Sequence, residues 1–450
     1  MKKILLPILL FVMFIPFEVG AKEYCKVVDG DGKSIGSEIS CGSEHFYIID
    51  SNEDEIKMLA KYNLYTGVTI YKEKLEEGQT CAELASSNGG VVKHDDFYNA
   101  PGYCFYSVRI EEEKILQKEE AKSAHWDEDL NYLYPQIGDV YISYSARDAD
   151  LFFRAKDTPV QENTKFYDFE INMENEDNDG LIKSLRRYKE GLEEENYTIN
   201  KIELLSLSEL ENIINKISNQ SLPLQEWSQN VEVVTPGTFI ETEVHFGDLK
   251  PYISPQYSWL YSTTYWNSTL YEVSRHPTYG PVNYYVFVAE QGKLCGAGFH
   301  YCAPETVLGC GLRPVITIPN ELQYIIKTET DGNGTIDVID NSLGGETIQF
   351  KVSAKNGYKL GSIVIKTDSG EKVEFSEGEI TKNDDGTFSI DKNKFTMPFE
   401  NITIQAKFEL ESILKNPKTG DKILFIIFTL VASIGIGIFI YKKKESRYNV

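Results

Sequence analysis

The C-terminal end places the tightest constraint on what this 450-residue chain can fold into. Residues 423–441 form an uncharged, mostly apolar run, and the three lysines at 442–444 follow it directly. A helix of this length crosses the roughly 30 Å hydrocarbon core of a bilayer. Lysines that follow such a span stay on the cytoplasmic side. We therefore expect a C-terminal transmembrane helix, with the preceding part of the chain outside the membrane.

Five residues lie just ahead of this span, namely Asn416, Pro417, Lys418, Thr419 and Gly420. A pentapeptide, then an apolar span, then a basic tail: this order resembles the LPxTG-type sorting signal of sortase substrates, with asparagine in place of the usual leucine. The proline favours an extended backbone, which suits a narrow enzyme groove. The resemblance implies that a sortase cysteine attacks the Thr419 carbonyl and that a peptidoglycan amine then takes the acyl group. The alternative is an ordinary single-span anchor with a chance pentapeptide.

The N-terminal end has the three parts of a secretory signal. Two of its first three residues are lysines, residues 4–17 are apolar except for prolines, and residues 19–21 read Val-Gly-Ala. The apolar run is shorter than the roughly 20 residues that a membrane anchor needs. We therefore expect a signal peptide over residues 1–21, cleaved between Ala21 and Lys22, rather than a retained anchor.

The mature chain is strongly acidic. The full sequence has a formal net charge of −24, and the two processed ends carry seven basic and three acidic residues, which leaves about −28 between them. Such a charge excludes nucleic acid as an expected partner. Solubility beside an anionic cell envelope explains it.

All seven cysteines lie in the exported part, where disulfides form and persist. They are Cys25, Cys41, Cys81, Cys104, Cys295, Cys302 and Cys310. The two short loops predict that Cys25 pairs with Cys41 and Cys81 with Cys104, although four cysteines allow three pairings. The odd number leaves at least one thiol over. The alternative is that several of them are buried core thiols.

Local patterns predict both helices and strands. Residues 46–63 indicate a hairpin around an acidic turn, with a helix as the alternative for the second half. The charged residues 111–124 favour a solvated helix. Apolar spacing predicts a helix over residues 180–192, then a strand, then a second helix whose N-terminus carries the capping box Ser206-x-x-Glu209. Residues 282–288 and 315–318 read as strands.

Four short motifs in this region resemble a functionally uncharacterised domain common in surface proteins of Firmicutes. That domain has a Y-x-x-x-L helix, an LL-T/S-x-x-E element, a YWL-type element and a terminal G-[VL]-RPVI strand. The matches here are Tyr188 with Leu192, residues 204–209, Trp259 with Leu260, and residues 311–316. The resemblance implies a fold distantly similar to the C-type-lectin-like fold of formylglycine-generating enzymes. Their copper-binding cysteine pair has no counterpart here, so their activity is not implied.

Residues 322–409 change character to short strand-like runs separated by turns such as DGNG, KNGY and DDGT. Their pattern resembles a divergent internalin-type B repeat. Such repeats usually act as spacers close to the wall, so the resemblance implies a small all-β stalk.

No motif for catalysis or metal binding stands out. The six histidines are scattered, with no H-E-x-x-H, and no G-x-S-x-G or phosphate-binding loop occurs. Residues 175–186 match only the first half of a calcium loop, since Arg186 stands where a carboxylate is needed. Residues 329–340 match it more closely, but a hairpin turn explains them better. We therefore expect no catalytic residue, no bound metal and no cofactor.

One aromatic stretch is a candidate for ligand binding. Tyr261, Tyr265 and Trp266 alternate with serine and threonine, and rigid rings beside hydroxyls are typical of binding surfaces. The alternative is that the segment, Trp259 above all, belongs to the core.

Together these features predict an α+β protein of five segments. They are a signal peptide (1–21), a cysteine-containing region (22–155) continuous with the next, a helix-strand-helix and aromatic region (156–319), a β repeat (320–410) and a sorting signal (411–450). The expected function is non-enzymatic binding or adhesion at the cell wall, through an extracellular glycan or protein ligand. The alternatives are a purely structural envelope protein and a secreted enzyme acting on glycans.

Overall fold

The computed structural model describes residues 22–92, 101–121, 125–127, 132–134, 144–145, 165–171, 173, 181–234, 243–276, 280–298, 309–383, 385 and 387–411. The predicted signal peptide, which ends at Ala21, the predicted sorting pentapeptide at 416–420 and the apolar run at 423–441 lie outside these residues. Within them, no helix has both the length and the apolar character needed to cross a bilayer. The described part is an α+β fold, rich in strands and with few helices.

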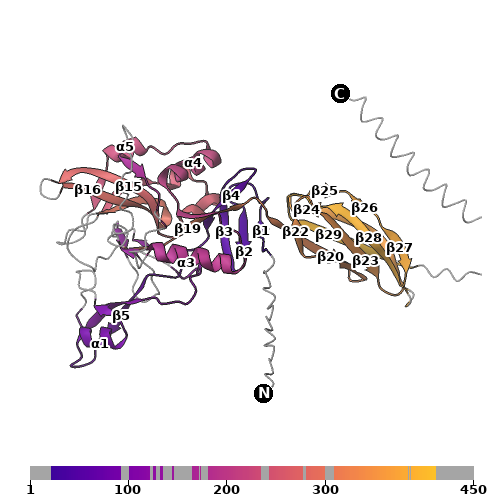
Figure 1. The fold of residues 1–450 in the computed structure, drawn as a ribbon, viewed down its shortest axis with the longest axis horizontal. Coiled ribbons are helices and arrows are strands. Elements are labelled where there is room, and N and C mark those ends of the chain that lie inside the picture. Colours follow the sequence, from indigo (N-terminus) through magenta and orange to yellow (C-terminus); the bar gives the residue numbers. More distant parts are fainter. Residues whose placement is uncertain are drawn as a thin grey trace, which may run out of the picture.

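A long mixed sheet joins the N-terminal and middle regions (Figure 1). The predicted hairpin at 46–63 is confirmed, with strands on both sides of its turn rather than a helix in the second half. From one edge inward the strands are β12 (Lys201–Leu204), β19 (Pro314–Pro319), β4 (Glu55–Ala60), β3 (Glu44–Ser51), β2 (Glu38–Cys41) and β1 (Lys26–Asp29). Because β19 pairs with β4, residues far apart in the sequence form one continuous body.

Two amphipathic helices pack on this body as their apolar spacing predicts. In α3 (Leu181–Glu194) the residues on one face are buried, including Tyr188 and Leu192. In α4 (Leu207–Ser218) the predicted capping box is confirmed, since Ser206 and Glu209 each bond the other's backbone N–H. A short helix, α5 (Leu224–Gln229), follows.

The helix predicted for residues 111–124 is wrong where the structure describes it. Residues 111–121 contain no helix, because their backbone bonds to distant parts of the chain instead. The Tyr65 N–H donates to the Leu116 carbonyl (2.8 Å), and the Gln117 N–H donates to the buried Glu44 carboxylate (2.8 Å). These contacts outweigh local helix propensity, which is weak in comparison.

A second, six-stranded sheet holds the aromatic region. Its order is β11 (Phe166–Asp168), β15 (Tyr265–His276), β16 (Gly280–Ala289), β17 (Lys293–Gly298), β14 (Glu243–Asp248) and β13 (Glu232–Val234). The predicted strand at 282–288 lies within β16, and the one at 315–318 within β19. The register of β15 against β16 shifts between Trp266 and Leu270. This bulge presents residues 267–269 toward the neighbouring elements.

Three smaller sheets complete the outer region. The pairs β8 (His125–Asp127) with β9 (Tyr132–Tyr134), and β10 (Tyr144–Ser145) with β18 (Gly309–Cys310), are short. The third contains β5 (Val68–Lys74), β7 (Tyr103–Arg109) and β6 (Val91–Val92), with α1 (Cys81–Ser87) packed on it.

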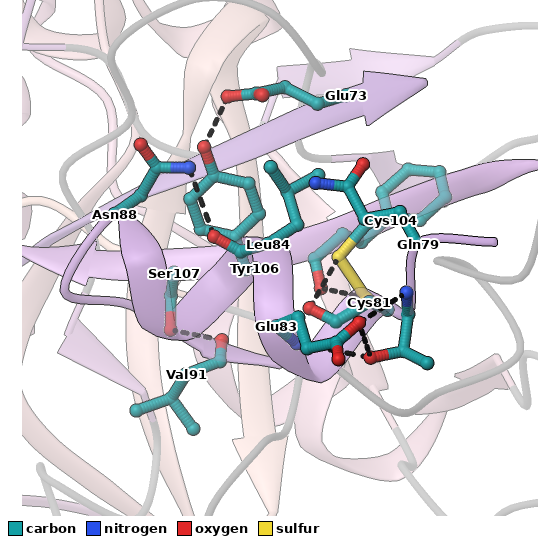
Figure 2. The surroundings of a disulfide bond; sticks show 12 residues. Glu73, Gln79, Cys81, Glu83, Leu84, Asn88, Val91, Cys104, Tyr106 and Ser107 are labelled. Atoms are coloured by element: carbon teal, nitrogen blue, oxygen red, sulfur yellow. Dashed lines mark hydrogen bonds between the residues drawn. A yellow bond between two sulfur atoms is a disulfide. The ribbon is translucent and has the colours of Figure 1, made fainter. Parts of the chain in front are cut away.

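Both predicted disulfides are present in the structure. Cys25 bonds Cys41, and Cys81 bonds Cys104, which ties α1 to β7 (Figure 2). Cys295 and Cys310 are buried, and Cys302 lies outside the described residues. The disulfides indicate an oxidising environment of the kind found outside the cytoplasm.

Residues 323–410 form a pair of packed sheets, which we call the C-terminal β unit (Figure 1), and the first of these sheets continues the long mixed sheet through the pairing of β1 with β20. The first sheet has β20 (Gln323–Thr330) and β22 (Asn341–Leu343), then β29 (Ile402–Leu410), β24 (Tyr358–Thr367) and β25 (Lys372–Val373). The second has β21 (Gly334–Asp337), β23 (Thr347–Ala354), β28 (Phe388–Thr396), β26 (Phe375–Ser376) and β27 (Glu379–Lys382). Alternating apolar side chains fill the space between them.

Candidate functional site

The aromatic segment does not form the ligand surface that its composition suggested. Tyr265 and Trp266 are fully buried, and Tyr261 is half-buried against the core. The Tyr265 hydroxyl donates to the Leu260 carbonyl (2.7 Å), and Trp266 packs edge-to-face on Phe287. These residues are core because β15 lies inside its sheet, with both faces covered. Trp259 is also part of this packing, half-buried and stacked on Tyr47 at 4.6 Å.

The G-L-R-P-V-I motif is structural for the same reason. The Arg313 side chain is fully buried and donates to the carbonyls of Ala60 (2.6 Å) and Trp259 (2.8 Å). It therefore joins the end of β4 to the segment before β15. A Cβ on Gly311 would lie 2.2 Å from the amide nitrogen of Asn63, so only glycine fits there.

The described residues form a hollow with polar groups converging on it, which we call the α4 hollow. Its volume is about 470 Å³, including its solvent-filled mouth. Strand β11, the first turns of α4 and helix α5 supply its walls. The lining residues are Lys165, Phe166, Asp168, Leu207, Ser208, Glu211, Leu224, Gln225 and Ser228.

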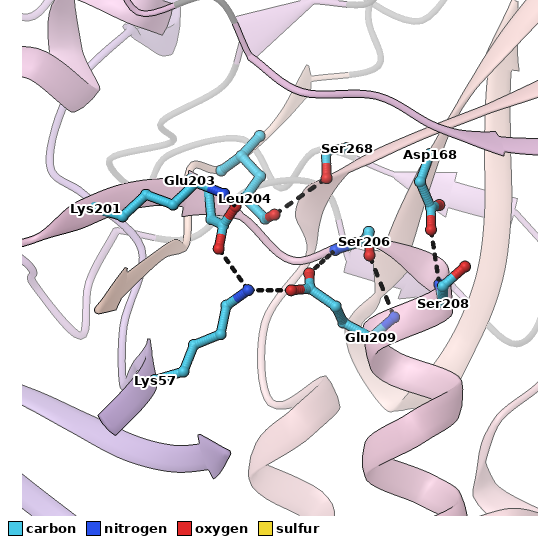
Figure 3. A network of polar contacts seen from close by, with 9 residues as sticks. All are labelled: Lys57, Asp168, Lys201, Glu203, Leu204, Ser206, Ser208, Glu209 and Ser268. Carbon is cyan, nitrogen blue, oxygen red and sulfur yellow. Dashed lines mark hydrogen bonds and ion pairs between the residues drawn. The ribbon is translucent and has the colours of Figure 1, made fainter. Parts of the chain in front are cut away.

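Asp168 is held in a fixed orientation at the N-terminus of α4 (Figure 3). One carboxylate oxygen accepts a hydrogen bond from the Thr269 hydroxyl (2.6 Å), and the other accepts one from the Ser208 N–H (3.3 Å). Thr269 is placed by the bulge in β15 and itself accepts the Leu207 N–H (2.8 Å). A carboxylate at this position also interacts favourably with the helix dipole.

Glu211 lies one turn further along α4 and faces the same hollow. Burial raises the pKa of Glu211, and the neighbouring Asp168 carboxylate raises it further. In the described part of the chain, no hydrogen bond or ion pair engages its carboxyl group. Glu211 is thus a half-buried acid that a cationic or hydroxyl-bearing ligand group would stabilise.

A network of charges supports the hollow from behind. Lys57 on β4 bridges Glu203 on β12 and Glu209 of the α4 cap (Figure 3). Lys201 contacts Glu203 as well (2.6 Å). Since Glu209 also caps the backbone, this network fixes the start of α4 and with it the position of Ser208. These groups hold the site in place and do not line it.

The other predicted site residues lie elsewhere. Lys22, the first residue after the predicted cleavage site, forms an exposed ion pair with Glu321. Asp331, within the calcium-like loop, accepts the N–H groups of Asn333 and Phe408 and so belongs to a hairpin turn. No cluster of histidine, cysteine and acidic side chains among the described residues is arranged to hold a metal ion.

Sequence reasoning missed the α4 hollow because its two acids carry no local motif. Asp168 and Glu211 are brought together only by the pairing of β11 with β15 and by the bulge at Thr269. The one sequence signal was the polar face of α4, next to the capping box. Comparison with protein-family models, curated proteins and solved structures finds no match to this chain.

Proposed function

We propose that this chain is an exported surface protein, joined to the cell wall at its C-terminal end, whose outer α+β region binds an extracellular ligand. The observation that carries the export step is the pair of disulfides at Cys25–Cys41 and Cys81–Cys104. The expected secretory signal ahead of them and the NPKTG-type sorting signal behind them support the same route. A sortase and peptidoglycan are then the partners in attachment.

Wall attachment is tested with Thr419→Ala, because the proposed acyl transfer takes place at the Thr419 carbonyl. We expect the wild-type protein to be released from cells by muralytic digestion and the variant to stay in the membrane fraction. Lys418→Ala is the matched control, since the x position of the motif tolerates change. Release of the Thr419 variant by muralytic digestion alone would refute sortase attachment.

Two finer aspects of the fold belong to this proposal. The first is that the outer region has a C-type-lectin-like fold, supported by the G-L-R-P-V-I segment, which leads into β19 between β12 and β4, and by the long excursion between β4 and β19. The second is that the C-terminal β unit is a B-repeat-like spacer, supported by its position between the outer region and the sorting signal. A spacer would hold the α4 hollow away from the wall.

For the ligand, we propose a glycan that carries amines or many hydroxyls, bound in the α4 hollow. Glu211 provides an unengaged acid, Gln225 and Ser208 add polar groups, and Phe166 and Leu207 give an apolar floor. Non-enzymatic binding fits better than glycoside hydrolysis, which usually needs two carboxyl groups available to the sugar. Both Asp168 oxygens already accept protein hydrogen bonds.

Binding is tested with the mature chain and two probes, glucosamine oligomers and their N-acetylated counterparts. We expect Glu211→Gln to weaken binding of glucosamine oligomers about tenfold, in line with a charge-assisted hydrogen bond of roughly 1.5 kcal/mol. Glu226→Gln is the control, because Glu226 is exposed on α5 and does not line the hollow. Equal affinity of all three proteins, or no binding to either probe, would remove the hollow from the proposal.

A further inference from the structure

The first and last strands of the C-terminal β unit lie side by side and run parallel (Figure 1). The pairs run from Ile326 opposite Ile402 to Thr330 opposite Ala406. The chain enters the unit at the start of β20 and leaves it at the end of β29. Because the two strands are parallel, these points lie at opposite ends of their shared hydrogen-bond ladder.

From this topology we propose that the C-terminal β unit is a load-bearing clamp. The inference rests on the proposed attachment at the C-terminal end, because tension between wall and ligand then pulls the entry and exit points apart. Parallel strands pulled from opposite ends slide along each other, so all the hydrogen bonds of the ladder resist together. A ladder pulled from one end would open one bond at a time.

Two further features strengthen the strand that receives the load. On its other side, β29 pairs with β24 along nearly its whole length, from Ile402 opposite Thr367 to Leu410 opposite Tyr358. Removing β29 along its axis must therefore break two ladders. The side chains of Ile402, Ile404 and Ala406 are buried in the unit's core, which keeps water from that side of the ladders.

Polar contacts extend the clamp beyond the paired residues. The Asp331 carboxylate, in the turn after β20, accepts the Phe408 N–H of β29 (2.8 Å). The Gln405 amide donates to Glu329 across the two strands (2.7 Å). The turn that resembles a calcium loop thus ties the end of β20 to the far end of β29.

Single-molecule pulling of the mature chain tests the clamp. One handle is attached at Glu321→Cys and the second either beyond Glu411 or at Glu371→Cys, both exposed positions. The first pair shears β20 against β29, and full unfolding releases about 300 Å of chain. The second pair loads the unit only from the junction end, and releases about 170 Å. We expect the rupture force in the second geometry to be at most about half of the force in the first.

Two aspartate variants refine this test. Asp331→Ala removes the contact with Phe408 and should lower the rupture force in the shear geometry. Asp385→Ala is the control, because the Asp385 carboxylate accepts the Thr387 N–H in a similar turn, and Thr387 belongs to neither β20 nor β29. Equal forces in both pulling geometries would overturn the clamp. That result would leave wall attachment untouched, since loss of attachment is read separately with Thr419→Ala.

Discussion

At the scale of single residues, close packing explains the G-L-R-P-V-I motif, which composition alone would assign to function. The Asn63 amide donates to the Ala121 carbonyl (3.1 Å) and to the Thr263 hydroxyl (2.9 Å), and it lies directly against Gly311. Arg313 completes the same junction from inside. The motif therefore specifies how the end of β4 meets β19, and its residues are fixed by space and hydrogen bonding.

Gly311→Ala should destabilise the outer region by about 3 kcal/mol, because the new methyl group would displace a buried, hydrogen-bonded amide. Urea unfolding measures this change. Gly191→Ala is the matched control in α3, where the added Cβ would meet only the flexible Lys114 side chain at 3.4 Å. For Gly191→Ala we expect no loss of stability, or a gain of about 0.5 kcal/mol from better helix propensity. Equal losses in both variants would contradict the packing argument.

Asp31 should make stability depend on acid pH. Partial burial acts to raise the pKa of Asp31, but hydrogen bonds from Ser34, Lys33 and Ser37 outweigh it and lower the pKa from 3.8 to about 2. A lowered folded-state pKa adds stability above pH 3.8, and this is lost as pH falls through about 2. Asp31→Asn should remove about 1 kcal/mol near pH 5 and nothing near pH 2, after allowance for solvent screening. Unfolding free energies across this range measure it.

Glu44 provides a control of opposite sign. Burial raises the pKa of Glu44 from 4.5, despite hydrogen bonds from Gln117 and Tyr188. A raised folded-state pKa adds stability below pH 4.5 that is lost as pH rises. Glu44→Gln should therefore be more stable than the wild type above pH 4.5, where Asp31→Asn shows its full loss of stability. Parallel pH profiles for the two variants would refute both assignments.

At the scale of elements, the β5–β7–β6 sheet with α1 is the part most dependent on a covalent bond. Among the described residues, the cluster between α1 and the sheet contains Ala85, Cys104 and Tyr106 as buried residues, and Ile70 and Phe105 are buried elsewhere in the sheet. The α1 capping box of Thr80 and Glu83 adds little stability, since both residues are exposed. A core this small rarely holds a fold without a staple.

Replacing both Cys81 and Cys104 by serine should therefore unfold this sheet locally. The disulfide closes a sequence separation of 23 residues, for which loop-closure entropy predicts about 3 kcal/mol. Hydrogen exchange should show residues 68–74 and 103–109 losing protection while α3 and α4 keep theirs. Unchanged protection of β5 and β7 would show that the sheet is stable without the bond.

The elements also show what sequence can and cannot predict. The α4 capping box and the buried face of α3 were predicted correctly, because both depend on contacts three or four residues apart. Tyr265 and Trp266 were misjudged because composition does not reveal that both faces of β15 are covered. The hydroxyls beside them serve internal contacts, since Thr264 accepts the Glu290 N–H (2.9 Å). Asp168 and Glu211 meet only through tertiary pairing, which no local pattern encodes.

At the scale of the whole molecule, strand pairing joins the outer region to the C-terminal β unit. Lys26 of β1 is the parallel partner of Gln323 of β20, and the Gln323 N–H donates to the Cys25 carbonyl (2.8 Å). The Cys25–Cys41 disulfide holds β1 on β2 directly beside this contact. Across the same junction, the Lys33 ammonium lies 4.2 Å from the centre of the Phe399 ring. The connection is thus a structured joint rather than a free linker.

We therefore expect the two parts to tumble as one body, with a single rotational correlation time in ¹⁵N relaxation measurements. Gln323→Pro with Phe399→Ala removes the backbone donor and the cation–π contact, worth about 0.5–1 kcal/mol at an exposed site, and should give two correlation times. Ile380→Ala, at an exposed position on β27, is the control and should leave one. Two correlation times in the wild type would contradict the joint. A rigid joint matters for the clamp, because it passes tension from the outer region straight into β20.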